Sequence, residues 1–564
     1  MNAHEMVTSQ DSKIDGAIVL ESWFADHADV AAVFVVLVGF LARLWAASGI
    51  FLNPDEALHF RLANQASLAM AYGQSTTAAH PPLLILFLYY WRALGTSDLW
   101  LRLPSVIAGA IFCWVFFKWL TQVTDRLTGF VGLLFVSFLL PIIMLAAEAR
   151  QYALLLAFAV GALYFLDRAF AETSVRLMVA STLCLYLAML THYSAFLFAA
   201  ALGIYALLWI FTRRLPMKVI TTWAGGQLGA LALAAFLYKT HLSRIGAGES
   251  RTVIEGWMTY IRRSYFDRAH DNPLVFLVSH TFGVFQYLFG QLAVGIVVGL
   301  LFLVGVFLLL REKSSTSRRL GLLLLVSFAI VGAASMVHVY PYGGTRHSAL
   351  LIMPGIAGAS LAVARITSGR WMRALAIAGA IIMLCLLFGK LRQPRMERAD
   401  QSRKQMAAVL EFVQQNVAPS APIFVDYQTD LVLGHYLCQQ RPVPLQIRPT
   451  GFEEFFCAGR HVASTGYPTW TFSSETFPGD WERAVQTLGL KPGDPVWVLQ
   501  TGWGIDLPEQ LQKHFAEFRD LRFESFGKNI KIFKLTVGQP MHRAKVPSAK
   551  TIELAGASAP APGL

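Results

Sequence analysis

The sequence predicts a mainly α-helical, polytopic membrane protein, with about eleven transmembrane helices and a C-terminal soluble α/β domain. Of its 564 residues, 55% are hydrophobic and only 15% are charged. The apolar residues form repeated runs, each close to the roughly 20 residues that a helix needs to cross a bilayer. Beyond about residue 395 polar residues return, and strand-like runs alternate with helical patterns, as in an aqueous domain.

The transmembrane domain is expected to cover residues 30–394, after a polar cytoplasmic segment at residues 1–29. That segment lacks the positively charged start of a secretory signal, so the first apolar run, 31–50, is expected to be retained as a span. Further spans are expected near residues 103–122, 128–147, 152–170, 176–192, 194–211, 218–238, 288–310, 320–339, 347–365 and 372–391. The loop 51–102 contains one shorter apolar run, Leu83–Leu94, which includes Arg92 and is expected to lie along the membrane interface.

Residues 395–540 are expected to form the soluble domain, with strands at Pro422–Val425, Val496–Leu499 and Ile530–Leu535. The tail 541–564 is rich in Ala and Pro and is expected to be disordered. Two of the five cysteines, Cys438 and Cys457, lie in the soluble domain and are expected to form a disulfide there. The other three lie in apolar runs, where cysteine behaves as a small core residue.

Basic residues gather in every second short loop and so predict the orientation. Loops on one side carry most of them, at Arg126, Arg168, Arg176, Arg213, Arg214, Lys218, Arg311, Lys313, Arg318, Arg319, Arg365, Arg370 and Arg373. Short loops on the other side carry little beyond Arg150 and Arg346. By the positive-inside rule, the N-terminus is cytoplasmic and residues 395–540 lie outside the inner (plasma) membrane. The net charge of +12 is explained by these loops, and no nucleic-acid partner is expected.

Two candidate site motifs lie in the first outer loop. Asn53–Glu56 places the adjacent carboxylates Asp55 and Glu56 directly after the first span, where they could act as a general base or bind a metal. Acidic residues are equally common in the first turn of a helix. His80 precedes two prolines at the start of the interfacial helix, where helix N–H groups could hold a phosphate; an ordinary surface histidine is the alternative.

Three more polar clusters fall on the same predicted outer face. Glu148–Tyr152 joins two spans with almost no loop, so Glu148 and Arg150 either pair structurally or bind a ligand. The segment Tyr340–His347 contains two glycines that permit close backbone approach, beside Arg346 and His347, which could bind a phosphate diester. His192 could bind a metal, but a solvated histidine at a helix end is more common. Because the orientation was derived from basic residues in other loops, this agreement predicts one shared outer site.

Taken in order, these motifs resemble the GT-C membrane glycosyltransferases. The resemblance rests on Asp55–Glu56, His80–Leu83, Leu101–Ser105, Glu148–Tyr152 and Thr191–Tyr193, and extends over about residues 30–365. The most similar group is the protein-mannosyltransferase-like one, which includes the RgtA/B/C/D-like lipopolysaccharide galacturonosyltransferases of the bacterial cell envelope and, more remotely, the aminoarabinose transferase of lipid A.

The resemblance implies an inverting transfer of a hexose or pentose from a polyprenyl-phosphate-linked sugar to a glycan, lipid or protein acceptor. Asp55 would be the general base, and Glu56 would support it or the acceptor. The donor phosphate would be bound by cationic and imidazole groups, namely His80, Arg150, Arg346 and His347, with support from Glu148, Tyr152, His192 and Tyr342. No cofactor is certain, and a divalent metal stays open because Ala79-His80 stands where the aminoarabinose enzymes carry Glu-Lys.

Two other functional classes remain as alternatives. A polytopic transporter would place polar or broken helices near the bilayer midplane, usually in two repeated halves, but the sequence has no internal repeat and its polar clusters lie at the outer boundary. A sensor would explain the C-terminal domain but not the carboxylates of the first loop.

Overall fold

The structure is a computed structural model that describes residues 3–76, 78–245, 261–388, 402–438, 452–466, 469–504 and 506–538. The chain divides into two compact units, which are described separately. The larger consists of Met1–Ala407 and Gly434–Pro444, and the smaller of Ala408–Leu433 and Leu445–Leu564. The expected domain boundary at 394/395 and the expected tail at 541–564 lie outside the described residues.

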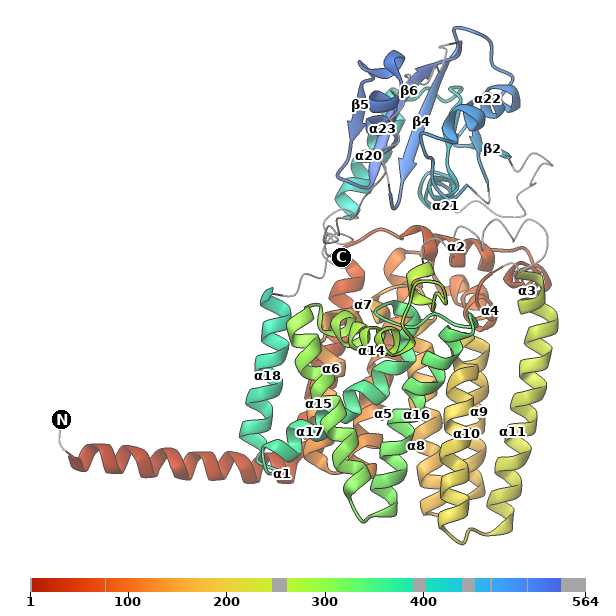
Figure 1. The fold of residues 1–564 in the computed structure, drawn as a ribbon. Coiled ribbons are helices and arrows are strands. Elements are labelled where there is room, and N and C mark those ends of the chain that lie inside the picture. The colour runs from red at the N-terminus through yellow and green to blue at the C-terminus, as the bar shows by residue number, and fades with distance from the viewer. Residues whose placement is uncertain are drawn as a thin grey trace. The chain divides into compact units, whose positions relative to one another are not determined.

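In the described part of the larger unit, nine helices are long and apolar enough to cross a membrane. They are α1 (Ala3–Ser48, apolar over Leu20–Ser48), α5 (Asp98–Val123), α8 (Tyr152–Ala171), α10 (Ser194–Thr212), α11 (Met217–Leu237) with η2 (Tyr238–Leu242), α15 (Leu292–Arg311), α16 (Ser315–Met336), η4 (Arg346–Leu351) with α17 (Ile352–Ile366), and α18 (Trp371–Phe388). The bent pair α6 (Arg126–Phe138) and α7 (Leu140–Ala147) is a tenth candidate, and the 17-residue helix α9 (Val175–Thr191) coincides with the remaining expected span. The predicted mainly helical membrane architecture is confirmed (Figure 1).

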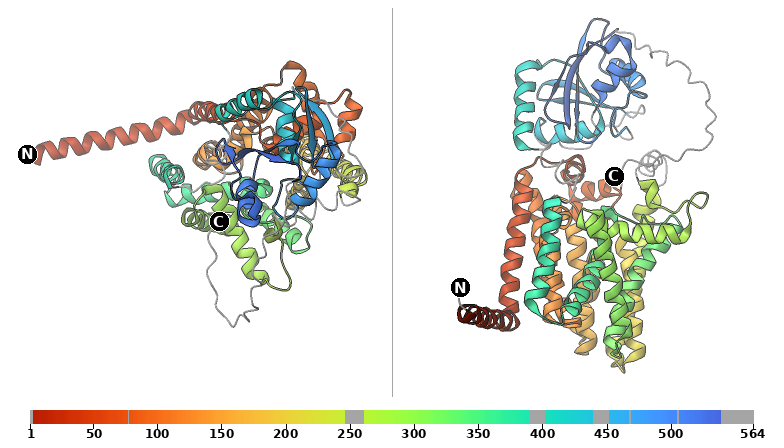
Figure 2. Two further views of the ribbon diagram at one scale, coloured as in Figure 1. Left: turned by 90° about the horizontal axis from the view of Figure 1, so that it is seen from above. Right: turned by 60° about the vertical axis from the view of Figure 1, so that its left-hand side comes forward.

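Short helices gather at one end of this bundle (Figure 1). They are α2 (Pro54–Ala63), α3 (Leu68–Ser75), α4 (Leu83–Trp91) with η1 (Arg92–Leu94), α12 (Ser243–Ile245), η3 (Arg262–Ser264) and the longer α14 (Pro273–Phe289). Helix α4 is too short to cross a bilayer and buries Leu84, Ile85 and Leu88 against Leu62 and Ala63 of α2. At the opposite end, α1 kinks at His27 and its first half turns away from the bundle (Figures 1 and 2).

An arginine from α1 donates hydrogen bonds to backbone carbonyls at the break between α6 and α7. Helix α6 ends at Phe138, α7 begins at Leu140 with Pro141 in its first turn, and the two helices are bent by 60°. The break removes helix partners from the last carbonyls of α6, and buried Arg43 donates to two of them, at 2.7 Å to the oxygen of Val136 and 3.1 Å to that of Ser137. A Cβ on Gly109 would lie 2.9 Å from Nε of Arg43, so a glycine is needed where the guanidinium passes.

The smaller unit is built on one six-stranded sheet in the order β2-β3-β1-β4-β6-β5. The strands β3, β1 and β4 are parallel, and the outer pairs are antiparallel. Their bounds are β1 (Ile423–Val425), β2 (Glu453–Cys457), β3 (Arg460–Ser464), β4 (Pro495–Thr501), β5 (Phe523–Ser525) and β6 (Ile530–Thr536). The three strands expected from the sequence are all present, as β1, β4 and β6.

Helices accompany the sheet as expected for an α/β domain: α20 (Arg403–Asn416), α21 (Tyr427–Tyr436), α22 (Phe477–Thr487), α23 (Leu507–His514) and η5 (Ala516–Phe518). The aromatic core of the unit centres on Phe424, whose ring lies 4.8 Å from Phe472 and 5.9 Å from Phe477. Cys438 and Cys457 are disulfide-bonded, whereas Cys113, Cys184 and Cys385 are free thiols.

Candidate active site

Asp55 is the point on which three distant segments converge. Asn53 caps α2, its side chain accepting a hydrogen bond from the backbone N–H of Glu56, so Asp55 lies in the first turn directly after α1. Its Oδ2 atom is ion-paired with Arg150 and, at 2.9 Å, with Nη2 of Arg346. These arginines lie 95 and 291 residues farther along the chain. The Asp55 side chain is 16% exposed and that of Arg346 is 26% exposed, so this centre is open to ligands.

Glu56, the neighbouring carboxylate, occupies a different environment. It is fully buried and accepts two hydrogen bonds from Arg102, at 2.7 and 2.6 Å. It also accepts from the backbone N–H groups of Ala149 at 2.7 Å and Asn53 at 3.0 Å. Arg102 in turn donates to the carbonyls that end α1 and lead into α2, namely those of Ala47, Ile50 and Phe51. Glu56 therefore ties α2 to α5 and to the α7–α8 junction, and its oxygens are occupied.

Three imidazoles form a column beside Asp55. The rings of His59 and His80 stack at 5.8 Å, and those of His80 and His192 at 5.2 Å. Burial lowers the pKa of His59 to about 4, and burial together with the neighbouring imidazoles and Arg346 holds the pKa of His80 well below its ordinary value. His59 also contacts Asp55 directly, its Nδ1 lying 2.6 Å from the backbone oxygen. Both rings are therefore neutral at pH 7.

His59 was not among the sequence-predicted residues. Its only sequence signal is its position four residues after Asp55 on a helix, which places both side chains on one face.

Glu148 is buried at the end of α7, where its backbone oxygen accepts from the N–H of Arg150 at 2.7 Å. The sequence grouped Glu148 with His80, His192 and His347 in one expected site; in the structure the backbone N–H of Ala149, next to Glu148, donates to Glu56, and the rings of His80 and His192 stack.

Several buried polar atoms at this junction have no hydrogen-bond partner among the described residues. They are Nδ1 of His80, Nε2 of His192, the hydroxyl of Tyr152 and both side-chain polar atoms of Gln151. Tyr152 and Gln151 are fully buried, and His192 is 3% exposed. The Tyr152 ring lies 5.4 Å from that of His192 and 5.5 Å from the guanidinium carbon of Arg150. Unpaired buried polar groups are costly, and in native proteins they concentrate at functional sites.

The segment that carries Arg346 packs on α14. Tyr342 is buried, its hydroxyl lies 2.5 Å from that of Thr281, and burial raises its pKa to about 12. The two glycines were expected to leave room for a ligand, but a Cβ on Gly344 would lie 2.5 Å from the carbonyl oxygen of Gly283. A Cβ on Gly343, whose φ is +127°, would lie 2.8 Å from the ring of His280. The close approach therefore serves packing against α14.

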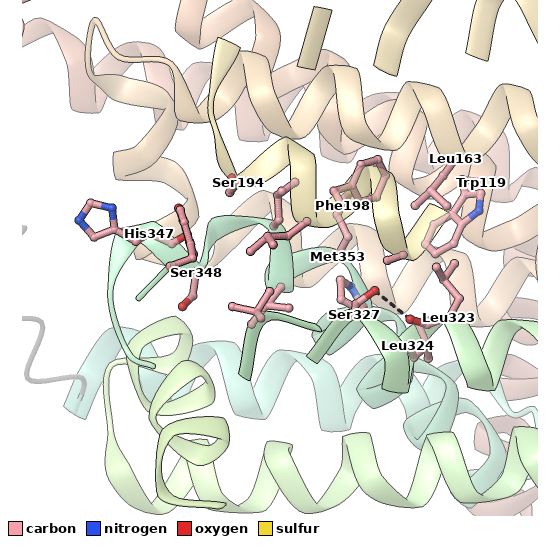
Figure 3. A pocket seen from close by; sticks show the side chains of 17 residues that line it. Trp119, Leu163, Ser194, Phe198, Leu323, Leu324, Ser327, His347, Ser348 and Met353 are labelled. Atoms are coloured by element: carbon pink, nitrogen blue, oxygen red, sulfur yellow. Dashed lines mark hydrogen bonds between the residues drawn. The ribbon is translucent and has the colours of Figure 1, made fainter. Parts of the chain in front are cut away.

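An apolar cavity of about 30 Å³ begins beside this cluster and continues between α10, α16 and α17. Figure 3 shows Ser194, His347 and Ser348 at one end and Trp119 and Leu163 at the other. Its lining is otherwise mostly leucine, phenylalanine and other apolar residues. We expected Asp55, His80 and Arg346 to line one cavity; they gather around the ion pair, whereas the lining of this cavity includes His347 and Tyr340.

The described residues of this site are not arranged as a metal centre. Among the described residues, no group of three or more His, Cys, Asp or Glu side chains is placed to hold a metal ion. The stacked imidazoles present ring faces to one another, which is not a ligand geometry. We therefore derive no chemical step through a metal.

Comparison with known proteins agrees with this architecture. Residues 79–238 match the family model described as dolichyl-phosphate-mannose-protein mannosyltransferase. The solved structure of ArnT from Cupriavidus metallidurans bound to undecaprenyl phosphate is similar over 91% of this chain and 99% of its own, with a TM-score of 0.51 and 13% identity. The chain is therefore similar to the GT-C glycosyltransferases, in fold over most of its length and in sequence over residues 79–238. The predicted resemblance is confirmed at that level.

Two other solved structures are also similar over most of this chain at low sequence identity. ArnT in the apo state is similar over 90% of this chain and 98% of its own, with a TM-score of 0.50 and 13% identity. The oligosaccharyltransferase of Archaeoglobus fulgidus, tethered to an acceptor peptide, matches over 88% of this chain and 71% of its own, with a TM-score of 0.49 and 10% identity. A search of curated proteins finds no match.

Proposed function

We propose that this protein transfers a sugar from a polyprenyl-phosphate donor to a hydroxyl-bearing glycan, lipid or protein on the outer face of the plasma membrane. The observation that carries the proposal is the clamp of Arg150 and Arg346 on Asp55 at the end of the bundle where the short helices gather. It supplies the base and the anion-binding groups that such a transfer needs, and no second carboxylate nucleophile is required for inversion.

In this mechanism Asp55 takes the proton of the acceptor hydroxyl as that oxygen attacks the anomeric carbon of the donor sugar. The bond from the anomeric carbon to the phosphate oxygen breaks, and the polyprenyl phosphate leaves with the negative charge. Arg346 and Arg150 stabilise that charge because a guanidinium presents a fixed fork of donors and stays ionised. Attack opposite to the leaving group inverts the anomeric configuration.

The same two arginines give the site a means of controlling its base. Without donor, both guanidinium groups pair with the carboxylate of Asp55 and occupy its Oδ2 atom. A bound diester phosphate competes for those donors and draws them away. The Asp55 carboxylate is then free to accept the proton of the acceptor hydroxyl only when the leaving group is in place, so the acceptor is activated late.

The apolar cavity and the structural neighbours support the nature of the donor. The cavity begins at His347 and Ser194, next to the clamp, and its mostly apolar lining matches the character of a polyprenyl chain. A polyprenyl phosphate is what the similar ArnT structure contains. The outer location follows the basic residues of the opposite loops.

The test is transfer from radiolabelled polyprenyl-phosphate sugar by purified protein in liposomes, followed as label moved to an extracted envelope acceptor fraction. Asp55→Asn should lower the rate by about 10²- to 10⁴-fold, since it removes the base. The matched control is Asp271→Asn, an exposed aspartate of the segment before α14 that lies outside the clamp. Equal loss in both variants, or full activity of Asp55→Asn, removes Asp55 from the mechanism.

A further inference from the structure

The connector Gly49–Leu52 joins α1 to α2 and leads directly into the turn that carries Asp55. Its last three residues are at most 2% exposed, so their backbone polar groups are cut off from water and need partners within the protein. Arg102 donates to two of the connector carbonyls, at 2.8 and 2.9 Å. The N–H of Leu52 depends on a different side chain.

That side chain is Tyr436, which belongs to the larger unit although it lies 384 residues farther along the chain. Its hydroxyl accepts the hydrogen bond from the N–H of Leu52 at 2.7 Å. Its ring lies edge-on to Phe51 at 6.2 Å, and the ring of neighbouring His435 lies edge-on to Phe60 at 5.2 Å. These two aromatic residues therefore contact both the connector and helix α2.

Asp98, in the first turn of α5, orients the same pair of residues. Its side chain is 7% exposed, and its carboxylate lies 3.3 Å from Nε2 of His435 and 3.2 Å from Nε of Arg403. The Tyr436 hydroxyl also interacts with this carboxylate. Because a carboxylate only accepts, the hydroxyl proton points to Asp98 and an oxygen lone pair faces the N–H of Leu52. The hydroxyl therefore has a fixed orientation.

We infer that Tyr436, oriented by Asp98, is a positioning residue for the catalytic base. This inference rests on the proposed function. Asp55 belongs to α2, whereas Arg346 comes from a separate segment, so the 2.9 Å contact between them depends on where the connector places the first turn of α2. A displacement of about 1 Å in a reacting group can lower a rate by about 10²-fold. The hydrogen bond to Leu52 thus contributes to turnover through the position of Asp55.

The test uses the full-length protein in the liposome transfer assay. Tyr436→Phe keeps the ring and removes the hydroxyl, which leaves the N–H of Leu52 without its acceptor. Turnover should fall by about 10- to 100-fold, while the dissociation constant for undecaprenyl phosphate, measured by native mass spectrometry, should stay unchanged because both clamp arginines lie outside α2.

Tyr186→Phe is the matched control, because it also removes one hydrogen bond between a tyrosine hydroxyl and the backbone. The Tyr186 hydroxyl donates to the carbonyl oxygen of Gly226 at 2.8 Å, outside the clamp. Both variants should melt below the wild-type temperature, since each leaves a backbone group without its partner. Only Tyr436→Phe should lose turnover.

A double variant separates positioning from stability. If Tyr436 acts through Asp55, its substitution has no further effect once the base has been removed. Tyr436→Phe combined with Asp55→Asn should therefore transfer sugar at the rate of Asp55→Asn alone, whereas a general loss of structure would lower the rate in both backgrounds equally. Asp98→Asn should act in the same way but more weakly, and it replaces Tyr436→Phe in this comparison if that variant does not fold.

The outcomes distinguish the inference from the function on which it rests. If wild-type protein transfers no sugar, or if Asp55→Asn is fully active, the proposed function fails and the inference fails with it. If Asp55→Asn is inactive while Tyr436→Phe keeps wild-type turnover, only the inference is overturned. It is overturned as well if Tyr436→Phe lowers the rate equally with and without Asp55, or if Tyr186→Phe loses as much turnover.

Discussion

Asp55 and Glu56 are adjacent in sequence, yet their substitutions should have opposite consequences. Glu56 and Arg102 are both fully buried, and the carboxylate accepts four N–H hydrogen bonds. In Glu56→Gln one carboxylate oxygen becomes an NH₂ group, which cannot accept the hydrogen bonds that this oxygen accepted. The buried charge of Arg102 also loses its counter-ion. Breaking one side of such a buried pair costs about 3–5 kcal/mol. Asp55→Asn changes a partly exposed position, so it should lower the free energy of unfolding much less while abolishing transfer activity.

The assay is thermal unfolding of purified wild-type, Glu56→Gln and Asp55→Asn protein in one detergent at one pH, followed by transfer activity at low temperature. Arg102→Lys is a useful companion, because an ammonium cannot span two carboxylate oxygens and three carbonyls together. We expect Glu56→Gln and Arg102→Lys to unfold early and the folded fraction of Glu56→Gln to stay active. A Glu56→Gln protein that melts like wild type but is inactive would refute this division of roles.

Three further predictions follow from the same geometry and from the orientation. Arg346→Lys should raise the Michaelis constant for the lipid donor or lower turnover, because lysine lacks the forked donor; unchanged kinetics would leave Arg346 as a helix anchor only. Because the pKa of His59 is lowered to about 4, the unfolded chain binds more protons than the folded one between about pH 6.5 and 4. Stability should thus be complete above pH 6.5 and fall below it by up to about 1.4 kcal/mol per pH unit for this histidine, as denaturant unfolding at several pH values can check. A reporter active only in the cytoplasm, fused after Lys390, should stay silent, and a signal would reverse the orientation.

The sequence was sufficient to predict the helical architecture and the convergence of Asp55, Arg150 and Arg346. The architecture follows from apolar run lengths, which the bilayer thickness constrains directly. The convergence follows from orientation, because basic residues of the opposite loops assign every polar junction to one side or the other. The sequence assigned Arg150 and Arg346 to the donor phosphate, so their pairing with Asp55 itself was not predicted.

What the sequence could not predict depends on side-chain direction. Asp55 and Glu56 are both acidic, and the sequence does not distinguish their roles. Their different positions on the first turn of α2 direct the Asp55 side chain to the two guanidinium groups and the Glu56 side chain to Arg102. The packing of Gly343 and Gly344 on α14 was not predicted, because close approach to a ligand and close approach to a helix require the same residue type. His59 has no motif at all, since its contact with the backbone of Asp55 depends on the helix that carries both.

The arginine that holds the α6–α7 break also sets a condition on how the chain enters the membrane. An arginine at the centre of a lone helix makes insertion less favourable by about 2.5–3.5 kcal/mol, and α1 carries this cost before the later helices are synthesised. The carbonyls that satisfy Arg43 belong to Val136 and Ser137, which are synthesised more than ninety residues later. We expect α1 to stay beside the insertion machinery until α6 arrives. The guanidinium then makes association of the two helices obligatory during biogenesis.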